Sequence, residues 1–120
     1  MTKTFSIRIQ KLDDALAETA RVWKGAEAGK KQKASTGIGF ASYQDMHRIL
    51  TPKRLDIVRA LAGNEPMSIR EVARRVGRDF KGVHTDVVAL AKAGVIDRTG
   101  DGVSFPYDRI HFEFDVTAAA

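Results

Sequence analysis

Side chains that can donate hydrogen bonds to the edges of nucleic-acid bases gather in one short stretch of the sequence. Lys81, His84 and Thr85 follow one another closely, and Gly82 lies among them. In the major groove of a DNA duplex, guanine O6 and N7 accept hydrogen bonds from lysine, and a threonine offers either its hydroxyl or its methyl group. We therefore predict base readout by Lys81, His84 and Thr85, with Gly82 allowing a close approach.

Arginine is concentrated around this stretch. Residues 53–92 contain nine Lys or Arg against five Asp or Glu, whereas residues 95–120 contain two against five. Guanidinium groups form charge-assisted hydrogen bonds with phosphates, and such contacts position a protein on DNA without reading its sequence. The alternative is that these arginines are solvated surface residues. We expect contacts with phosphates or the adjacent minor groove from Arg70, Arg74, Arg75, Arg78 and Arg98.

Other kinds of chemistry find little support in the sequence. The chain has no cysteine, which excludes disulfides, thiolate zinc sites and cysteine nucleophiles. His47, His84 and His111 are far apart in the sequence, and none belongs to a metal-binding or catalytic motif. The sequence therefore predicts neither an enzyme nor a cofactor or metal site.

The composition is that of an ordinary globular protein. The 120 residues suit one domain, 43% of them are hydrophobic, and the formal net charge is +5. Net positive charge favours a polyanionic partner. No apolar run reaches the roughly 20 residues needed to span a bilayer, and the amino terminus does not resemble a signal peptide. We expect a cytoplasmic protein without membrane contact.

Two helices are predicted directly before the helix that carries the readout residues. Thr51 before Pro52 is typical of a helix start, so we expect a first helix over residues 51–62. Ser68 opens the capping-box pattern S-x-x-E, which predicts a second helix over residues 69–76. These two helices would support the one that carries the readout residues.

A third helix is predicted over residues 80–93, capped by Asp79 and reached through a tight turn at Gly77. Its outward face would carry the readout residues. Asp86 also faces outward in this prediction, so it either points away from DNA or orients a neighbouring arginine. The inward positions are Phe80, Val83, Val87 and Leu90.

Short strands complete the predicted domain. Residues 95–98 and 103–105 flank a Gly-rich turn at residues 99–102, which predicts a β-hairpin. Three helices with a tight turn between the last two, followed by a hairpin or wing, form the winged helix-turn-helix plan of the α+β class. Alternating apolar residues predict one further strand at each end, over residues 4–10 and 110–116.

The chain accordingly divides into four predicted segments. Residues 1–29 form a strand and a helix for dimerisation or partner contact, and residues 30–39 form a flexible basic linker. Residues 40–107 form the winged helix-turn-helix domain, and residues 108–120 form a carboxyl-terminal strand and tail. The two terminal strands pair either within one chain or across a two-fold axis. We favour the second arrangement, which makes a homodimer.

Residues 68–98, SIREVARRVGRDFKGVHTDVVALAKAGVIDR, resemble the core of MarR-like and ArsR-like bacterial and archaeal regulators. Matching positions include the Val76-Gly77 helix end and the Gly94-Val95-Ile96 entry to the hairpin. The resemblance covers roughly residues 50–105 and implies a DNA-binding transcriptional regulator. At Gly82 and His84 those families often have Ser or Thr, which leaves the base contacts open.

The sequence also leaves room for a protein partner, either in addition to DNA or instead of it. The whole chain resembles small regulators that act as antitoxins in type II toxin-antitoxin pairs, which implies a cognate toxin and autoregulation of the operon. Winged helices also serve as protein-docking modules that do not bind DNA. A continuous positive strip over residues 70–85 would favour DNA. Carboxylates that neutralise this strip, together with an apolar patch elsewhere, would favour docking.

Overall fold

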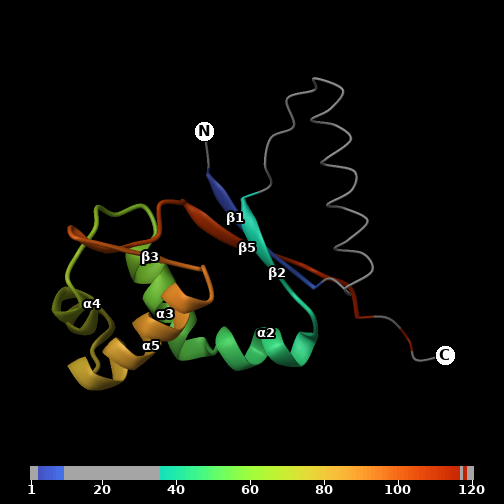
Figure 1. Ribbon diagram of the computed structural model, residues 1–120, viewed down its shortest axis with the longest axis horizontal. Coiled ribbons are helices and arrows are strands. Elements are labelled where there is room, and N and C mark those ends of the chain that lie inside the picture. The colour runs from blue at the N-terminus through green and yellow to red at the C-terminus, as the bar shows by residue number, and fades with distance from the viewer. Residues whose placement is uncertain (1–2, 10–35, 117, 119–120) are drawn as a thin grey trace.

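The computed structural model describes residues 3–9, 36–116 and 118, which form an α+β fold (Figure 1). The helix predicted to follow the first strand within residues 1–29 lies outside these ranges. The described helices are α2 (Tyr43–Ile49), α3 (Pro52–Leu61), α4 (Ile69–Val76) and α5 (Phe80–Lys92). The strands are β1 (Thr4–Ile9), β2 (Gly37–Phe40), β3 (Asp97–Thr99), β4 (Gly102–Ser104) and β5 (Arg109–Glu113).

The helices begin and end where the capping residues predict. Thr51 accepts a hydrogen bond from the Arg54 amide at the start of α3, and Pro52 occupies the first turn. Ser68 accepts from the Glu71 amide at the start of α4. Gly77 ends α4 in the left-handed conformation, with φ of 69°, which glycine adopts without strain. Local sequence signals therefore fix the two helices that precede α5 and the turn that leads into it.

Part of the predicted linker is a strand. Gly37–Phe40 pair with β1 in parallel, which corrects the prediction that the linker extends through residue 39. The physical reason is that Ile38 and Phe40 fall opposite Ile7 and Ile9, so their side chains join the same apolar face. A Cβ added at Gly37 would lie 2.1 Å from the Ser6 carbonyl oxygen, so only glycine fits there.

The two chain ends meet in one sheet. β1 is central, with β2 on one side and β5 on the other, all parallel. β1 and β5 pair within the chain, whereas we favoured pairing between two chains. Phe5 and Ile7 of β1 are buried in the same hydrophobic core as the helices, so the amino-terminal strand is built into the body of the fold.

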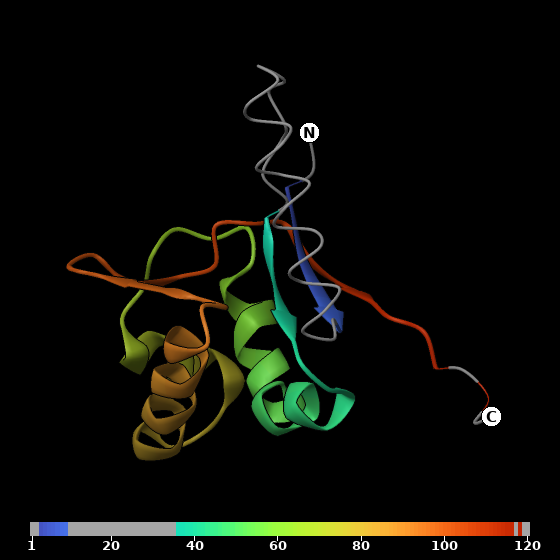
Figure 2. The same ribbon diagram turned by 45° about the vertical axis from the view of Figure 1, so that its right-hand side comes forward.

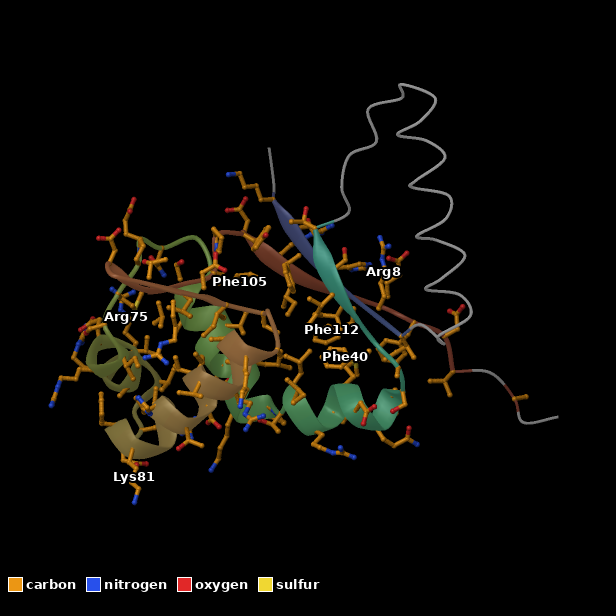
Figure 3. The ribbon with its side chains drawn as sticks, viewed as in Figure 1. Arg8, Phe40, Arg75, Lys81, Phe105 and Phe112 are labelled. Atoms are coloured by element: carbon orange, nitrogen blue, oxygen red, sulfur yellow. The ribbon has the colours of Figure 1, made fainter. Side chains whose placement is uncertain are left out.

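Three aromatic rings connect this sheet to the helices. Phe105 is fully buried, and its ring centroid lies 5.6 Å from that of Phe5 and 5.1 Å from that of Tyr107. Figure 3 shows Phe40, Phe105 and Phe112 directed into the interior. Tyr107 also accepts a hydrogen bond through its carbonyl from the Gly63 amide after α3. The sheet and the helices are therefore packed as one body.

The β3–β4 hairpin follows α5 and projects away from the three-stranded sheet (Figure 2). Two backbone hydrogen bonds between Met67 and Val103 attach it to the segment before α4. Gly102 has φ of 125°, and a Cβ there would lie 2.5 Å from the Met67 carbonyl oxygen. Both observations explain why glycine occupies this position.

Candidate nucleic-acid interface

The outer face of α5 carries three of the four predicted readout residues. Lys81, His84 and Thr85 are exposed, whereas Val83 and Val87 on the inner face are fully buried. Figure 3 shows the Lys81 side chain directed away from the body. The Thr85 hydroxyl donates to the Lys81 carbonyl oxygen over 3.1 Å, so towards a ligand it can accept a hydrogen bond or offer its methyl group.

Gly82, the fourth predicted readout residue, belongs to the cap of α5. Its amide donates to the Asp79 carboxylate over 2.8 Å, and the residue is half-buried. A Cβ there would lie 3.0 Å from one Asp79 oxygen and 3.3 Å from a nitrogen of the Arg78 guanidinium. The absence of a side chain thus makes room for the cap and for Arg78.

Arg78, predicted to contact phosphate, is engaged inside the fold. Its guanidinium lies 2.8 Å from one oxygen of Asp86, and Arg54 lies 3.0 Å from the other. The side chains of Arg78 and Asp86 are only 22% and 15% exposed. Of the two roles that we considered for Asp86, orienting a neighbouring arginine is the one seen. Arg78 is therefore a positioning residue between α4 and α5.

Arg54 extends this ion-pair cluster to the end of α2. Besides Asp86, its guanidinium donates to the carbonyl oxygens of Ile49 over 3.0 Å and Arg48 over 3.3 Å. Burial by itself would raise the pKa of Asp86, but the hydrogen bonds from Arg54 and Arg78 outweigh it, and the pKa is lowered. Asp86 therefore stays ionised and holds three helices in fixed relation.

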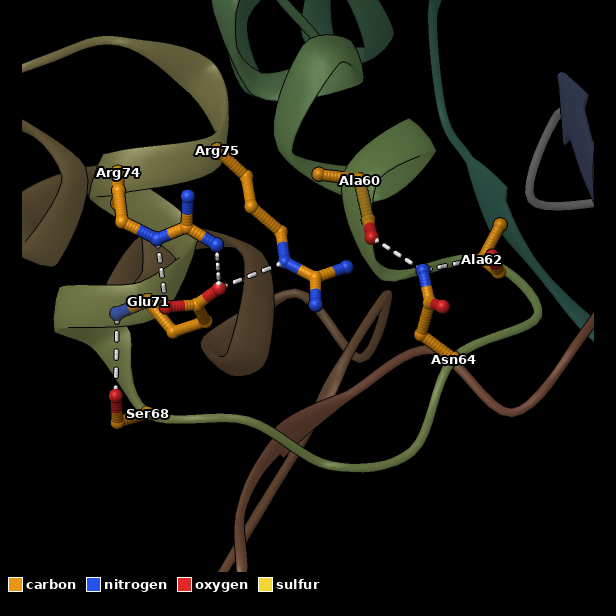
Figure 4. A network of polar contacts seen from close by, with 7 residues as sticks. All are labelled: Ala60, Ala62, Asn64, Ser68, Glu71, Arg74 and Arg75. Atoms are coloured by element: carbon orange, nitrogen blue, oxygen red, sulfur yellow. Dashed lines mark hydrogen bonds and ion pairs between the residues drawn. The ribbon is translucent and has the colours of Figure 1, made fainter.

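Arg74 and Arg75 share one carboxylate. Both form ion pairs with Glu71 on α4, and the Arg75–Glu71 distance is 3.0 Å (Figure 4). Hydrogen bonds from Arg74 and then Arg75 lower the pKa of Glu71 to about 2. Both arginine side chains remain exposed, at 71% for Arg74 and 41% for Arg75. Glu71 thus reduces the charge that this pair presents to a partner.

Phe80 is exposed, although we predicted that it faces inward. It is 43% exposed, with the Arg70 guanidinium 5.0 Å from its ring centroid and the His84 ring centroid 5.8 Å away. The reason is its place at the first position of α5, where it lies three residues before the buried Val83 and about 60° to one side of it around the helix. The inward prediction for Phe80 was wrong.

Arg98 is exposed on β3 of the hairpin. Figures 1 and 2 both place the hairpin and the α4–α5 pair on the side of the molecule away from β2 and β5. The structure thus gathers Lys81, His84 and Thr85 on one helix, with Arg70 beside them. Sequence periodicity did not reveal the roles of Arg54 and Phe80, since both depend on contacts between elements.

The described residues contain neither a metal-binding cluster nor a membrane-spanning helix. Within the ranges given above, no three His, Asp or Glu side chains group closely enough to hold a metal ion. No helix in the described part of the chain is long and apolar enough to cross a membrane.

The protein is thus a small α+β domain, and α4, α5 and the hairpin carry the exposed cationic side chains Arg70, Lys81 and Arg98. Residues 49–112 match the family HVO_A0114. Because this match covers more than half of the chain, the protein belongs to that family. The matched range contains α3, α4, α5 and the hairpin. A search of curated proteins found no match.

Proposed function

We propose that the protein is a winged helix-turn-helix transcriptional regulator that binds double-stranded DNA through α5. The order α3, α4, three-residue turn, α5 and hairpin supports this proposal because it follows the winged helix-turn-helix plan. In that plan the helix after the turn enters the major groove. The hairpin and Arg98 then reach the neighbouring backbone or minor groove.

One observation carries the proposal. Lys81, His84 and Thr85 are exposed together in the first turns of α5, on the side away from the fully buried Val83 and Val87. A recognition helix needs this division, because its inner face must be fixed by packing while its outer face meets base edges.

The charge distribution supports DNA binding in part. Arg70, Lys81 and Arg98 form no ion pair with any described residue, so their charges are available to phosphates. The positive strip expected over residues 70–85 is interrupted, however. Asp86 holds the Arg78 side chain inside the fold, and Glu71 forms ion pairs with both Arg74 and Arg75. We therefore assign phosphate contacts to Arg70, Arg74, Arg75 and Arg98.

Three further predictions from the sequence remain predictions. They are that the protein forms a homodimer, that it binds a cognate toxin and that it is located in the cytoplasm. Because β1 and β5 pair within one chain, a dimer of this fold would form without exchange of these strands. Two copies would place two recognition helices on a pseudo-palindromic site.

Protein docking is the second candidate function, and one apolar surface favours it. A pocket of about 290 Å³ at the end of the three-stranded sheet is lined by Ile9, Tyr43, Phe114 and Val116, together with Asp115. Tyr43 and Val116 are 43% and 83% exposed. Exposed apolar surface of this kind is typical of interaction sites. This pocket does not involve α5, so docking and DNA binding would use different surfaces.

The proposal is tested by titrating the protein into fluorescently labelled duplexes while polarisation is measured. One duplex carries the DNA upstream of the protein's own gene and the other a scrambled sequence, each at two salt concentrations. We expect tighter binding to the first duplex and weaker binding to both at higher salt, because phosphate contacts release counterions. Absence of binding to either duplex at low salt would overturn the proposal and favour docking.

A further inference from the structure

Phe80 is an apolar side chain exposed among cationic and polar groups. The large apolar side chains that the structure leaves exposed among described residues are Tyr43, Phe80 and Val116. Of these three, only Phe80 lies on α5, at its first position and one residue before Lys81. An aromatic ring at a binding surface can supply an apolar contact, because covering it in a complex removes apolar surface from water.

Two neighbours hold the ring in place. The Arg70 guanidinium lies 5.0 Å from the ring centroid, within the range of a cation–π contact. The His84 ring, one helical turn further along α5, has its centroid 5.8 Å away at an angle of 39°. Since both contacts restrict the ring before DNA arrives, binding would cost less conformational entropy than for a free side chain.

The major groove offers one apolar group at base edges. Thymine carries a C5-methyl group there, and small apolar or aromatic side chains, phenylalanine included, contact it. The predicted donors Lys81 and His84 suit guanine and other polar edges, so they cannot recognise a methyl group. Phe80 lies on the His84 side of α5, within the same first turns.

We propose that Phe80 recognises the C5-methyl group of a thymine in the bound site, positioned by Arg70 and His84. This inference rests on the proposed function and adds a specificity-determining residue to it. It gives α5 an aromatic apolar contact beside the polar contacts of Lys81 and His84 and the hydroxyl or methyl contact of Thr85.

The test replaces thymine by deoxyuridine, one position at a time, in the duplex from the protein's own upstream region. Deoxyuridine lacks only the methyl group, so the polar edge of the base is unchanged. Affinities are measured for the wild type, Phe80→Ala and Tyr43→Ala. Tyr43 is the matched control because it is an aromatic residue of the same exposure, 43%, on α2.

We expect at least one replacement to weaken wild-type and Tyr43→Ala binding about fourfold, the value of one buried methyl group. Phe80→Ala should bind the thymine and deoxyuridine duplexes equally. Phe80→Leu, which keeps an apolar side chain, should retain a preference for thymine. Circular dichroism of each variant shows whether it is folded, and half-exposed Phe80 should tolerate truncation.

Two results would overturn the inference while leaving the proposed function standing. In the first, the wild type binds its duplex specifically but no deoxyuridine replacement weakens binding. In the second, Phe80→Ala keeps the full preference for thymine. A wild type that binds no duplex would instead overturn the proposed function, and this inference would fall with it.

Discussion

Glu71 determines how much positive charge α4 presents. Its carboxylate lies between Arg74 and Arg75, and the hydrogen bonds from these two arginines lower its pKa to about 2. At neutral pH the carboxylate is fully ionised and offsets one of the two arginine charges. Because all three side chains are at least partly exposed, these ion pairs contribute little to folding stability. Their effect should appear in binding.

Glu71→Gln should therefore strengthen binding to any duplex, specific or scrambled, by about threefold to tenfold at low salt. One more arginine charge becomes available to phosphate, so the slope of log affinity against log salt should steepen by about 0.9. Polarisation titrations over a salt series measure both quantities. Glu65→Gln, in the exposed loop before α4, is the control and should change neither. Weaker binding by Glu71→Gln would contradict this role.

The position of α5 depends on the Arg54–Asp86–Arg78 cluster. Arg54 belongs to α3 and contacts the end of α2, Arg78 lies in the turn before α5, and Asp86 lies in the middle of α5. The three side chains are between 15% and 22% exposed. Removal of the carboxylate would leave two poorly solvated guanidinium groups without a counter-charge.

Asp86→Asn should lower the free energy of unfolding by about 1 to 3 kcal/mol at pH 7. The pKa of Asp86 is lowered in the fold from its ordinary value of 3.8. The stabilisation is therefore complete well above pH 3.8 and is lost as pH falls through the folded pKa. The difference between wild type and Asp86→Asn should shrink in acid.

Urea denaturation at several pH values measures this difference. Asp56→Asn, at an exposed position on α3, serves as the control and should have little effect at any pH. If wild type and Asp86→Asn have the same free energy of unfolding at pH 7, the cluster does not stabilise the fold. The same conclusion follows if the difference between their free energies of unfolding grows as pH falls.

The hairpin depends on Gly102 for its attachment to Met67. Gly102→Ala should destabilise the protein by about 1 to 3 kcal/mol, because φ is 125° and the new Cβ would lie 2.5 Å from the Met67 carbonyl oxygen. Gly100→Ala, in the same turn with no atom within 4 Å of its Cβ position, should be close to neutral. Thermal unfolding of the two variants makes the comparison. Equal stability would contradict the account of this turn.

Helices and turns that are determined by residues close together in the sequence could be predicted from the sequence. Capping residues and glycines placed α3, α4, α5 and the hairpin within a few residues of their bounds. The strand β2 was missed because its parallel pairing with β1 is nonlocal, and the Gly- and Lys-rich segment around it favoured a linker. Periodicity did predict both terminal strands, but it could not decide whether they pair within one chain, as β1 and β5 do, or between two chains.

The same distinction applies to the candidate interface. Helical periodicity correctly placed Lys81 and Thr85 on the outer face of α5, almost opposite Val83. Phe80 and Asp86 each lie about 60° from Val83, one on either flank of the buried stripe. At such positions contacts with other elements decide between burial and exposure. Phe80 extends past the packed helices, whereas Asp86 is covered by two arginines.

We propose that the molecule binds DNA with the exposed first turns of α5. The most direct measurement compares the double variant Lys81→Ala, Thr85→Ala with Lys92→Ala, which removes the same charge from the other end of α5. Each is titrated against the upstream duplex and the scrambled duplex. The double variant should lose at least tenfold in affinity for the upstream duplex, since each base contact contributes about 1 to 3 kcal/mol. Lys92→Ala should bind like the wild type. If the folded double variant binds the upstream duplex as tightly as the wild type, α5 does not read the DNA.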